Sequence, residues 1–492
     1  MERKWPELIF SGEDDPAVLS RAVRRGRLRR LATGIYTGDV EADPEDVVRR
    51  ALWRIVGHEL PGAVIVDRSA RRAGPVDGQL FVDHSRVRPL ELPGVTIVPR
   101  RGPGHVAGDM EMPDGLWQSS IARQLLDNLN RSRGAARRTL DDVEVEEWVD
   151  TLLGEQREKG LNRLRDQARE LAPVLRREKE FARLDAIIRA ALTTGDVDVL
   201  RSERLQARAS GRPFDDKRVA AFEALADDLT NRPPDILPDL PADAARRRLL
   251  PFYEAYFSNY IEGTEFTLDE AASIVFEEAV PADRPADAHD ILGTYEIVSD
   301  PREMSRVPAN ADDFERLLVD RHARLMAGRP DKMPGQYKVK ANRAGSTEFV
   351  APELVVGTLR RGYEVASSLS GPFSRAVYMM FLTAEVHPFT DGNGRVARIM
   401  MNAELVAGGE VRIVIPTVYR ANYLAALKGA THTGHYAALH AMLAYARRYT
   451  AQVDFSSREH AEADLRRTNA LRDSAEAESA GMRLALPSTV ER

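Results

Sequence analysis

The sequence predicts a mainly α-helical protein with a small α/β region at its N-terminal end. Apolar residues recur with a period near 3.6 over most of the chain beyond about residue 136, which is typical of amphipathic helices. Short apolar runs between Gly- and Pro-containing turns, which are typical of strands, are concentrated before about residue 135. A chain of 492 residues is too long for one hydrophobic core, so we expect two to four domains.

The composition indicates a globular protein, with 43% hydrophobic and 30% charged residues. The absence of cysteine excludes thiol catalysis, Cys-ligated zinc and disulfides, and suits a reducing cytoplasm. No apolar run reaches the roughly 18 residues of a membrane span, and the charged start at residues 1–4 leads into no apolar signal region. A formal charge of −6 argues against extensive nucleic-acid coating, so any basic patch must be local.

Residues 1–135 contain a local basic patch. Asp15 as N-cap, Pro16 at the first helical position and Gly26 as a stop predict a short helix. Residues 27–31 and 35–37 then indicate two strands that turn at Thr33-Gly34. A helix followed by a small basic hairpin is the pattern of a winged helix, and six arginines lie between positions 21 and 30.

An α/β module is expected to follow, with a helix at 45–57 and strands at 64–66, 80–82 and 95–98. The stretch LSRAVRRGRLRRLATGIY resembles the N-terminal domain of AbiEi-type antitoxins and related regulators. Two interpretations of region 1–135 stay open, binding of DNA or a protein partner through the arginines, and a structural module whose arginines are solvated.

Residues 136–235 are expected to form a helical linker or recruitment region. Charged, Leu- and Ala-rich segments predict helices at 141–171, 173–192 and 217–229, with Arg- and Glu-rich faces that are solvated or recruit a partner. Pro233-Pro234 and residues 238–241 predict a stiff connector, and we place a domain boundary there.

Residues 387–398 combine a histidine, a carboxylate, two glycines around an asparagine, and two arginines. The successive backbone N–H groups of Gly392, Asn393 and Gly394 suit an anion nest at a helix N-terminus. Arg395 and Arg398, at i and i+3, share a helix face on which they can clamp phosphate oxygens.

The two remaining groups of this stretch supply chemistry. Asp391 directly precedes the nest and suits Mg²⁺ that bridges phosphates. His387 can accept a proton from an attacking hydroxyl. Together these groups indicate transfer from a nucleotide to a hydroxyl, against the alternative of a Gly-rich helix cap with solvated arginines.

This stretch matches the signature HPF-x-[DE]-GNGR-x-x-R, through which the chain resembles the Fic family. The resemblance implies an all-helical core at 236–455 that transfers AMP from ATP to a Ser, Thr or Tyr hydroxyl of a target protein. It implies that His387 is the general base, that Asp391 is the Mg²⁺ ligand and that Phe389 anchors the loop. It also implies that Arg395 and Arg398 hold the outer phosphates. Some relatives transfer other groups or remove AMP.

A second motif precedes this core. The helical pattern at 246–260 ends at Gly263, and Ser258 and Glu262 lie at i and i+4 on one face. A glutamate at a helix C-terminus is opposed by the macrodipole and favours a cationic partner. The Fic resemblance implies an inhibitory helix at about 246–263, in which Glu262 pairs with Arg398 and withdraws it from ATP. The other interpretation is a helix end with an exposed glutamate.

The rest of the core is expected to contain helices at 267–278, 287–299, 312–328, 352–369 and 374–386. Residues 335–340 and 347–350 indicate a β-hairpin, which matches the flap that clamps a target backbone in the Fic family. Tyr423 is carried over as a residue of the nucleotide pocket. His322 is expected to be a packed structural residue, and His432, His435 and His440 to be surface residues. The tail at 456–492 is expected to be one helix and a frayed end.

The main hypothesis is therefore a cytoplasmic protein adenylyltransferase that uses ATP and Mg²⁺ and is inhibited by its own Glu262. One alternative is AMP removal at the same site, with Glu262 positioning a water. The other is a DNA- or partner-binding regulator whose core senses ATP. The target protein, the acceptor residue and the oligomeric state, including a homodimer, are left open.

Overall fold

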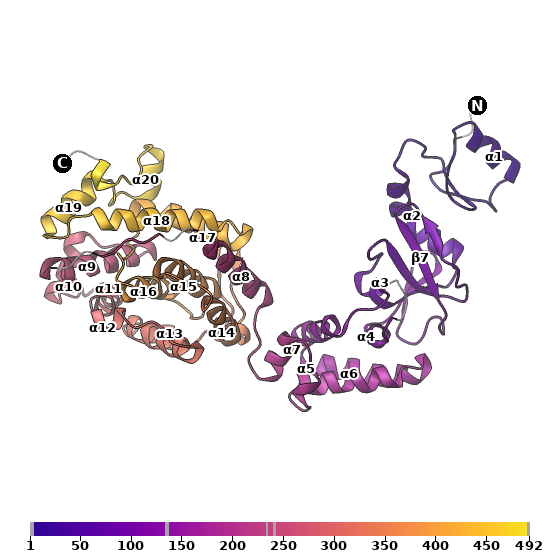
Figure 1. The fold of residues 1–492 in the computed structure, drawn as a ribbon, viewed down its shortest axis with the longest axis horizontal. Helices are drawn as coiled ribbons and strands as arrows, with labels where there is room; N and C mark the ends of the chain where they lie inside the picture. Colours follow the sequence, from indigo (N-terminus) through magenta and orange to yellow (C-terminus); the bar gives the residue numbers. More distant parts are fainter. Residues whose placement is uncertain (1–3, 133–136, 233–234, 240–242, 490–492) are drawn as a thin grey trace. The chain divides into compact units, whose positions relative to one another are not determined.

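The computed structural model describes residues 4–132, 137–232, 235–239 and 243–489. The chain divides into two compact units, Met1–Gly211 and Arg212–Arg492 (Figure 1). The predicted fold class is confirmed, because the protein is mainly helical with a mixed α/β region in the first unit and a small hairpin in the second. Within the described ranges, no helix has both the length and the apolar character needed to cross a membrane.

The boundary between the two units lies ahead of the position that the prolines indicated. The predicted connector residues Pro233, Pro234 and Pro241 lie outside the described residues. α8 (Asp216–Thr230), which the sequence pattern assigned to the helical middle, belongs to the second unit. Its buried Phe222 and Leu225 join the core of that unit, so the helix is fixed by packing and not by the neighbouring prolines.

The first unit begins with one helix and a three-stranded antiparallel sheet. The helix starts at Asp15, whose side chain accepts a hydrogen bond from the Ala17 N–H, as predicted. The predicted hairpin forms, and a strand that the sequence did not reveal pairs with its second arm. These elements are β1 (Ile9–Phe10), α1 (Pro16–Arg24), β2 (Arg29–Ala32) and β3 (Ile35–Thr37).

A six-stranded mixed sheet forms the next part, in the order β6-β7-β5-β4-β9-β8. The predicted strands are β4, β5 and β7, whose apolar side chains are buried except that of Val98, which is half-buried. The other three strands have three residues each, too few for an alternating pattern to be recognised. The elements are α2 (Pro44–Glu59), β4 (Val64–Ile65), α3 (Asp67–Arg72), β5 (Gln79–Asp83), β6 (Leu90–Leu92), β7 (Val95–Arg100), β8 (Met110–Met112), β9 (Leu116–Gln118) and α4 (Ile121–Leu129).

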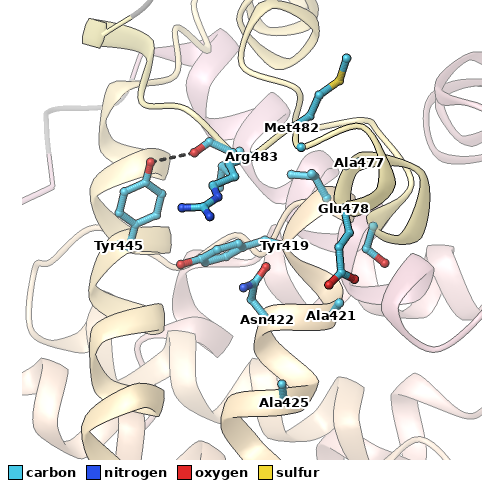
Figure 2. Close-up of a pocket in the computed structure, with 13 residues that line it drawn as sticks. Tyr419, Ala421, Asn422, Ala425, Tyr445, Ala477, Glu478, Met482 and Arg483 are labelled. Carbon is cyan, nitrogen blue, oxygen red and sulfur yellow. Dashed lines mark hydrogen bonds between the residues drawn. The ribbon is translucent and has the colours of Figure 1, made fainter.

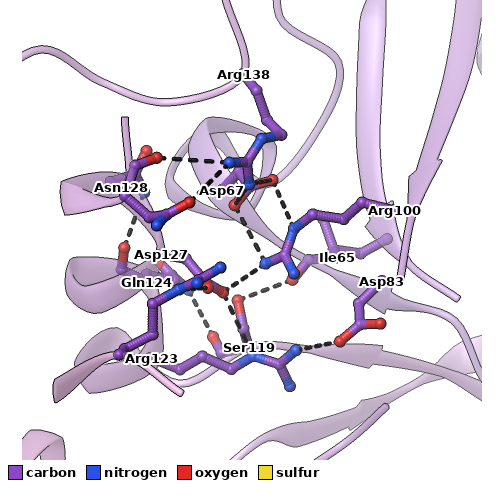
Figure 3. Close-up of polar contacts among 12 residues, drawn as sticks. Ile65, Asp67, Asp83, Arg100, Ser119, Arg123, Gln124, Asp127, Asn128 and Arg138 are labelled. Atoms are coloured by element: carbon purple, nitrogen blue, oxygen red, sulfur yellow. Dashed lines mark hydrogen bonds and ion pairs between the residues drawn. The ribbon is translucent and has the colours of Figure 1, made fainter. Parts of the chain in front are cut away.

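A buried network of charges joins this sheet to α4 (Figure 3). Arg123, which is fully buried, pairs with Asp83 at 2.7 Å and with Asp109 at 2.6 Å. Asp67 lies between Arg100 and Arg138, at 3.0 Å and 2.9 Å. Each of these buried charges has a partner of opposite sign, so we interpret the network as structural.

The first unit ends in a helical layer, α5 (Asp142–Leu175), α6 (Glu178–Ala191) and α7 (Glu203–Ala209). The predicted break before Pro173 is wrong, because α5 continues through this proline and ends at Arg176 in the left-handed conformation. Proline removes one hydrogen bond near the end of the helix, while Leu171 and Leu175 on either side are buried in the core. Burial outweighs the missing bond.

The second unit is built around two buried helices, α15 (Pro372–Val386) and α16 (Asn393–Ala407), which lie in its middle in Figure 1. Every residue from Ala376 to Val386 is buried, so these two helices form the floor that carries the motif loop between them. The surrounding helices are α9 (Ala244–Ile261), α10 (Leu268–Glu277), α11 (Pro285–Val298), α12 (Pro301–Met304), α13 (Ala311–Leu325), α14 (Val355–Ala366), α17 (Arg420–Thr433) and α18 (Tyr436–Gln452).

Two parts of the second unit differ from the prediction. The hairpin consists of β10 (Arg343–Ala344) and β11 (Thr347–Glu348), so its first arm lies after residues 335–340 and not within them. The tail forms two helices, α19 (Arg458–Arg467) and α20 (Ser474–Ser479), instead of one. Leu465 and Leu484 of the tail are buried in the core of the unit, so this segment is part of the fold.

Candidate active site

The loop between α15 and α16 has a fixed shape that its own residues determine. His387 ends α15 in the left-handed conformation (φ 52°), and Gly392 takes the same conformation (φ 73°) before α16 begins at Asn393. The Asn393 side chain accepts a hydrogen bond from the Phe389 N–H at 2.8 Å and donates to the Phe389 carbonyl at 2.9 Å. The Phe389 ring is fully buried, so the loop is anchored in the core.

His322 of α13 holds this loop from beneath. Its ring stacks on Phe389, with centroids 3.6 Å apart. Nε2–H donates to the Asp391 carbonyl at 3.0 Å, and Nδ1 accepts from the Gly335 N–H at 3.0 Å, which assigns the tautomer. Burial lowers the pKa of His322 to about 4, so the ring is neutral near pH 7. The residue is packed, and it also shapes the loop.

His387 presents one ring nitrogen to the site. Its Nδ1 lies 3.2 Å from the Ala384 carbonyl, to which Nδ1–H donates, so Nε2 keeps its lone pair. Burial lowers the pKa of His387 to about 4, and the positive charge of Lys338 acts in the same direction. Glu262 and Asp391 oppose this shift electrostatically. The imidazole is therefore neutral near pH 7 and can accept a proton.

Asp391 lies two residues before the start of α16. Its Oδ1 accepts a hydrogen bond from the Gly392 N–H at 2.7 Å, and the side chain is 44% exposed. Within the described ranges, no three His, Cys, Asp or Glu side chains converge into a metal site. One exposed carboxylate fits Mg²⁺ that brings most of its ligands as phosphate oxygens and water.

Arg395 is held by residues from two other helices. Its guanidinium pairs with Asp290 of α11 at 2.7 Å and donates to Asn259 of α9 at 3.4 Å. Asp290 and Asn259 are both buried, and Asp290 also pairs with Arg329 at 2.8 Å. The sequence did not reveal the roles of these two residues. Asp290 lies in no motif, and Asn259 lies within the second motif at a position to which the motif assigns no role.

Arg398 contacts the second motif directly. Its Nε donates to the Ser258 hydroxyl at 3.0 Å, and a terminal nitrogen donates to the Ser258 carbonyl at 2.8 Å. The same nitrogen pairs with Glu262 at 2.7 Å. Although burial opposes its charge, Glu262 holds the pKa of Arg398 above its usual value. Arg398 therefore contacts both Ser258 and Glu262, the two residues of the second motif.

The Glu262 carboxylate also lies over the first turn of α16. A Cβ atom on Gly394 would come within 2.1 Å of Glu262 Oε1. A phosphate that approached the N–H groups of this turn would meet a carboxylate already present there.

Tyr423 of α17 packs against the Arg398 guanidinium. Its side chain is buried, and the Arg398 guanidinium is 5.9 Å from the centre of its ring. Its hydroxyl faces the Met380 sulfur at 3.5 Å, and burial raises its pKa. Tyr423 thus contacts the motif, whereas His432 contacts the hairpin through Thr347 at 2.9 Å.

A separate pocket of about 860 Å³ lies between α17, α18 and α20 (Figure 2). Tyr419, Asn422 and Arg483 line it, and the Tyr445 hydroxyl donates to the Leu484 carbonyl at 2.9 Å beside it. None of the predicted site residues lines this pocket.

In a comparison with known proteins, residues 313–405 match the model of the Fic/DOC family. Two similar proteins are protein adenylyltransferase fic-1 of Caenorhabditis elegans and protein adenylyltransferase Fic of Nematostella vectensis. The first is 24% identical over 46% of this chain and 45% of its own length. The second is 26% identical over 55% of this chain and 66% of its own length. The alignments thus cover less than two thirds of these relatives.

Solved structures give more distant likenesses. Residues 134–508 of Fic-1 from C. elegans match with a TM-score of 0.33 and 20% identity, over 69% of this chain and 93% of that one. A Fic-domain-containing signaling protein from Bacteroides thetaiotaomicron matches with a TM-score of 0.38 and 18% identity, over 50% and 97%.

Proposed function

We propose that this chain, a homologue of Fic/DOC family protein adenylyltransferases, transfers AMP from ATP to a hydroxyl of a protein target. The observation that carries the proposal is the convergence of His387, Asp391, Arg395 and Arg398 around one loop and the helix N-terminus that follows it. A neutral imidazole, an exposed carboxylate and two buried arginines supply a base, a metal ligand and a phosphate clamp.

The reaction requires the hydroxyl oxygen of the target to form a bond to the α-phosphorus of ATP. The bond from the α-phosphorus to the bridging oxygen breaks, and pyrophosphate leaves. Nε2 of His387 takes the hydroxyl proton, while Nδ1–H remains bound to the Ala384 carbonyl. Asp391 would hold Mg²⁺, which neutralises phosphate charge when it is bound. The N–H groups at the start of α16 and the arginines hold the phosphates.

The same contacts support autoinhibition by α9. Glu262 pairs with Arg398 and lies over Gly394, so it competes with phosphate for one cation and for one space. ATP bound beside it has an α-phosphorus turned away from in-line attack. A displacement near 1 Å can reduce a rate by about a hundredfold. The resting enzyme is therefore inactive or nearly so.

Labelling with α-³²P-ATP in a cell extract tests both parts of the proposal. We expect little transfer of label by the wild type, strong transfer by Glu262→Gly and none by Glu262→Gly with His387→Ala. ATP binding by calorimetry should persist in the double variant, because His387 does not hold phosphate. Equal labelling by wild type and Glu262→Gly would contradict autoinhibition. No labelling by Glu262→Gly in any extract would contradict AMP transfer.

AMP removal is a second candidate for the same site. The Glu262 side chain is 31% exposed, and its negative charge partly offsets the lowering of the His387 pKa by burial. It could therefore position a water for hydrolysis. Release of AMP from targets labelled by Glu262→Gly would favour this function if wild type performs it and Glu262→Gly does not.

The first unit offers a surface for a nucleic-acid or protein partner. Exposed arginines lie in α1 and between α1 and β2, including Arg24 and Arg25, and the first turn of α1 has no acidic residue. Residues 1–211 should shift duplex DNA at low salt, and Arg24→Ala with Arg25→Ala should weaken this binding. No affinity for DNA at low salt would leave the arginines as a protein-docking surface.

A further inference from the structure

The segment that leads into the hairpin is attached to the loop that carries His387. The Lys338 N–H donates to the Pro388 carbonyl at 2.9 Å, and the Asn342 side chain donates to the Phe389 carbonyl at 3.0 Å. The Lys338 ammonium donates to Asn342 Oδ1 at 2.7 Å and to the Val386 carbonyl at 3.4 Å. Residues on both sides of His387 are thus bound to one short segment.

The segment that leaves the hairpin covers the imidazole itself. The Phe349 ring stacks on His387 with centroids 3.7 Å apart and planes 6° from parallel. The Lys338 ammonium lies 5.9 Å from the centre of the same Phe349 ring. Lys338 is only 3% exposed, which is unusual for a lysine and indicates that its position is set by the structure.

We propose that Phe349 and Lys338 are positioning residues for His387. Phe349 fixes the plane of the imidazole, the Ala384 carbonyl fixes its edge, and Lys338 holds both Phe349 and the end of α15 in place. Of the two ring nitrogens, Nδ1 is engaged by the Ala384 carbonyl, so Nε2 faces an incoming hydroxyl. The hairpin and the base therefore move as one unit. This inference rests on the proposed function only for its kinetic consequences.

The electrostatics of the site agree with this geometry. Burial beneath Phe349 lowers the pKa of His387, Lys338 lowers it further, and Glu262 and Asp391 raise it. Burial, with a contribution from Arg218, lowers the pKa of Lys338 itself to about 8. Loss of either the aromatic cover or the lysine charge should therefore raise the pKa of His387.

The first test follows the His387 ring by NMR and needs no activity. In the wild type the stacked Phe349 ring should shift the carbon-bound protons of His387 upfield, and the ring should titrate near 4. Phe349→Leu should abolish the upfield shift and raise the pKa, and Phe349→Tyr should restore both. Lys338→Met should raise the pKa, whereas Lys340→Met, which removes an exposed charge two residues away, should not.

Val339→Ala serves as the matched control for Phe349→Leu, because the Val339 side chain is 71% exposed beside Lys338. Circular dichroism shows whether each variant is folded. An unchanged shift and pKa of His387 in folded Phe349→Leu would overturn the proposal for Phe349. Equal effects of Lys338→Met and Lys340→Met would overturn it for Lys338. Neither result depends on whether the chain transfers AMP.

The second test measures transfer in the Glu262→Gly background. A misplaced base reduces turnover, so Phe349→Leu should lower kcat by about ten- to a hundredfold. Phe349→Tyr should recover most of it. The KM for ATP should change little, because neither residue contacts the phosphate-binding groups. A change confined to KM would overturn the positioning role, whereas no transfer by Glu262→Gly itself would refute the proposed function alone.

Discussion

Each motif arginine is paired with a carboxylate from outside the motif. Arg395 contacts Asp290, and Arg398 contacts Glu262. The two pairs differ in exposure, because the Asp290 side chain is 2% exposed and the Glu262 side chain 31%. A buried carboxylate keeps a buried arginine charged and oriented. A partly exposed carboxylate can move away and be replaced by phosphate. We therefore interpret Asp290 as a permanent partner of Arg395 and Glu262 as a displaceable partner of Arg398.

This difference predicts the effect of Asp290→Asn. The substitution leaves Arg395 and Arg329 with one shared amide in place of a charge, so the second unit should lose about 3 kcal/mol of unfolding free energy. Asp287→Asn, at a more exposed partner of Arg329, should cost less than about 1 kcal/mol. Urea unfolding followed by far-UV circular dichroism measures both. Similar costs for the two variants would contradict the assignment.

At the scale of elements, the inhibitory contact joins the C-terminal end of α9 to the N-terminal half of α16. Three hydrogen bonds link Arg398 to α9 and its cap, two to Ser258 and one to Glu262. The two hydrogen bonds that Arg398 donates to Ser258 depend on the position of the helix, and the one that it donates to Glu262 depends on a single side chain. The inhibited state therefore depends on the helix as well as on the glutamate.

Ser258→Ala should consequently release inhibition in part. It removes the hydroxyl acceptor and leaves the carbonyl and Glu262, so about 1 kcal/mol of the contact is lost. This corresponds to roughly a fivefold rise in labelling over wild type, well below that of Glu262→Gly. The measurement is the initial rate of α-³²P-AMP transfer. A rate equal to that of the wild type would show that the Ser258 hydroxyl contributes nothing to inhibition. A rate equal to that of Glu262→Gly would show that inhibition depends entirely on this hydroxyl.

At the scale of the whole molecule, the two units have separate cores. All four tryptophans, at positions 5, 53, 117 and 148, belong to the first unit, so their fluorescence reports on that unit alone. Circular dichroism reports on helices of both units. The chain therefore contains its own probe for testing whether the units unfold separately.

Phe381→Ala supplies the perturbation. Phe381 is fully buried in the core of the second unit, and its truncation should cost about 3–5 kcal/mol. We expect the helical transition of this unit to move to lower urea, while the tryptophan transition stays at its wild-type midpoint. A parallel shift of the tryptophan transition would show that the two units unfold together.

Acid should destabilise the second unit through its buried histidines. His322 and His387 have folded pKa values of about 4, below the ordinary value near 6.5. The unfolded chain therefore binds more protons between these values, and stability falls as pH drops from 6.5 toward 4. By pH 5 each histidine should cost roughly 2 kcal/mol.

His322→Gln tests this pH dependence. It should reduce the loss of unfolding free energy between pH 7 and pH 5 by roughly 2 kcal/mol, although it is less stable at pH 7 because the loop loses its support. His435 is exposed, so His435→Gln should lose as much unfolding free energy between pH 7 and pH 5 as the wild type does. Circular dichroism in urea measures this loss. An unchanged loss in His322→Gln would contradict the burial argument.

The sequence by itself determined the helical fold class, the motif loop and the residues that could contact each other locally. Gly392, Asn393 and the pattern of α15 and α16 carry that information within a few turns, because capping, left-handed glycines and apolar periodicity are local effects. Ser258 and Glu262 were also identified, through the spacing of one helix turn and the resemblance to a family.

Only the tertiary structure decided which distant side chains complete the site. Asp290 and His322 lie outside every motif, and Asn259, Lys338 and Phe349 lie in predicted segments at positions to which no motif gave a role. The roles of all five depend on contacts across 38 to 136 positions of sequence. The course of α5 through Pro173, the position of the hairpin and the packing of the tail were decided in the same way. For α5 and for the tail, burial of leucine side chains in a shared core outweighed the local preference of the chain.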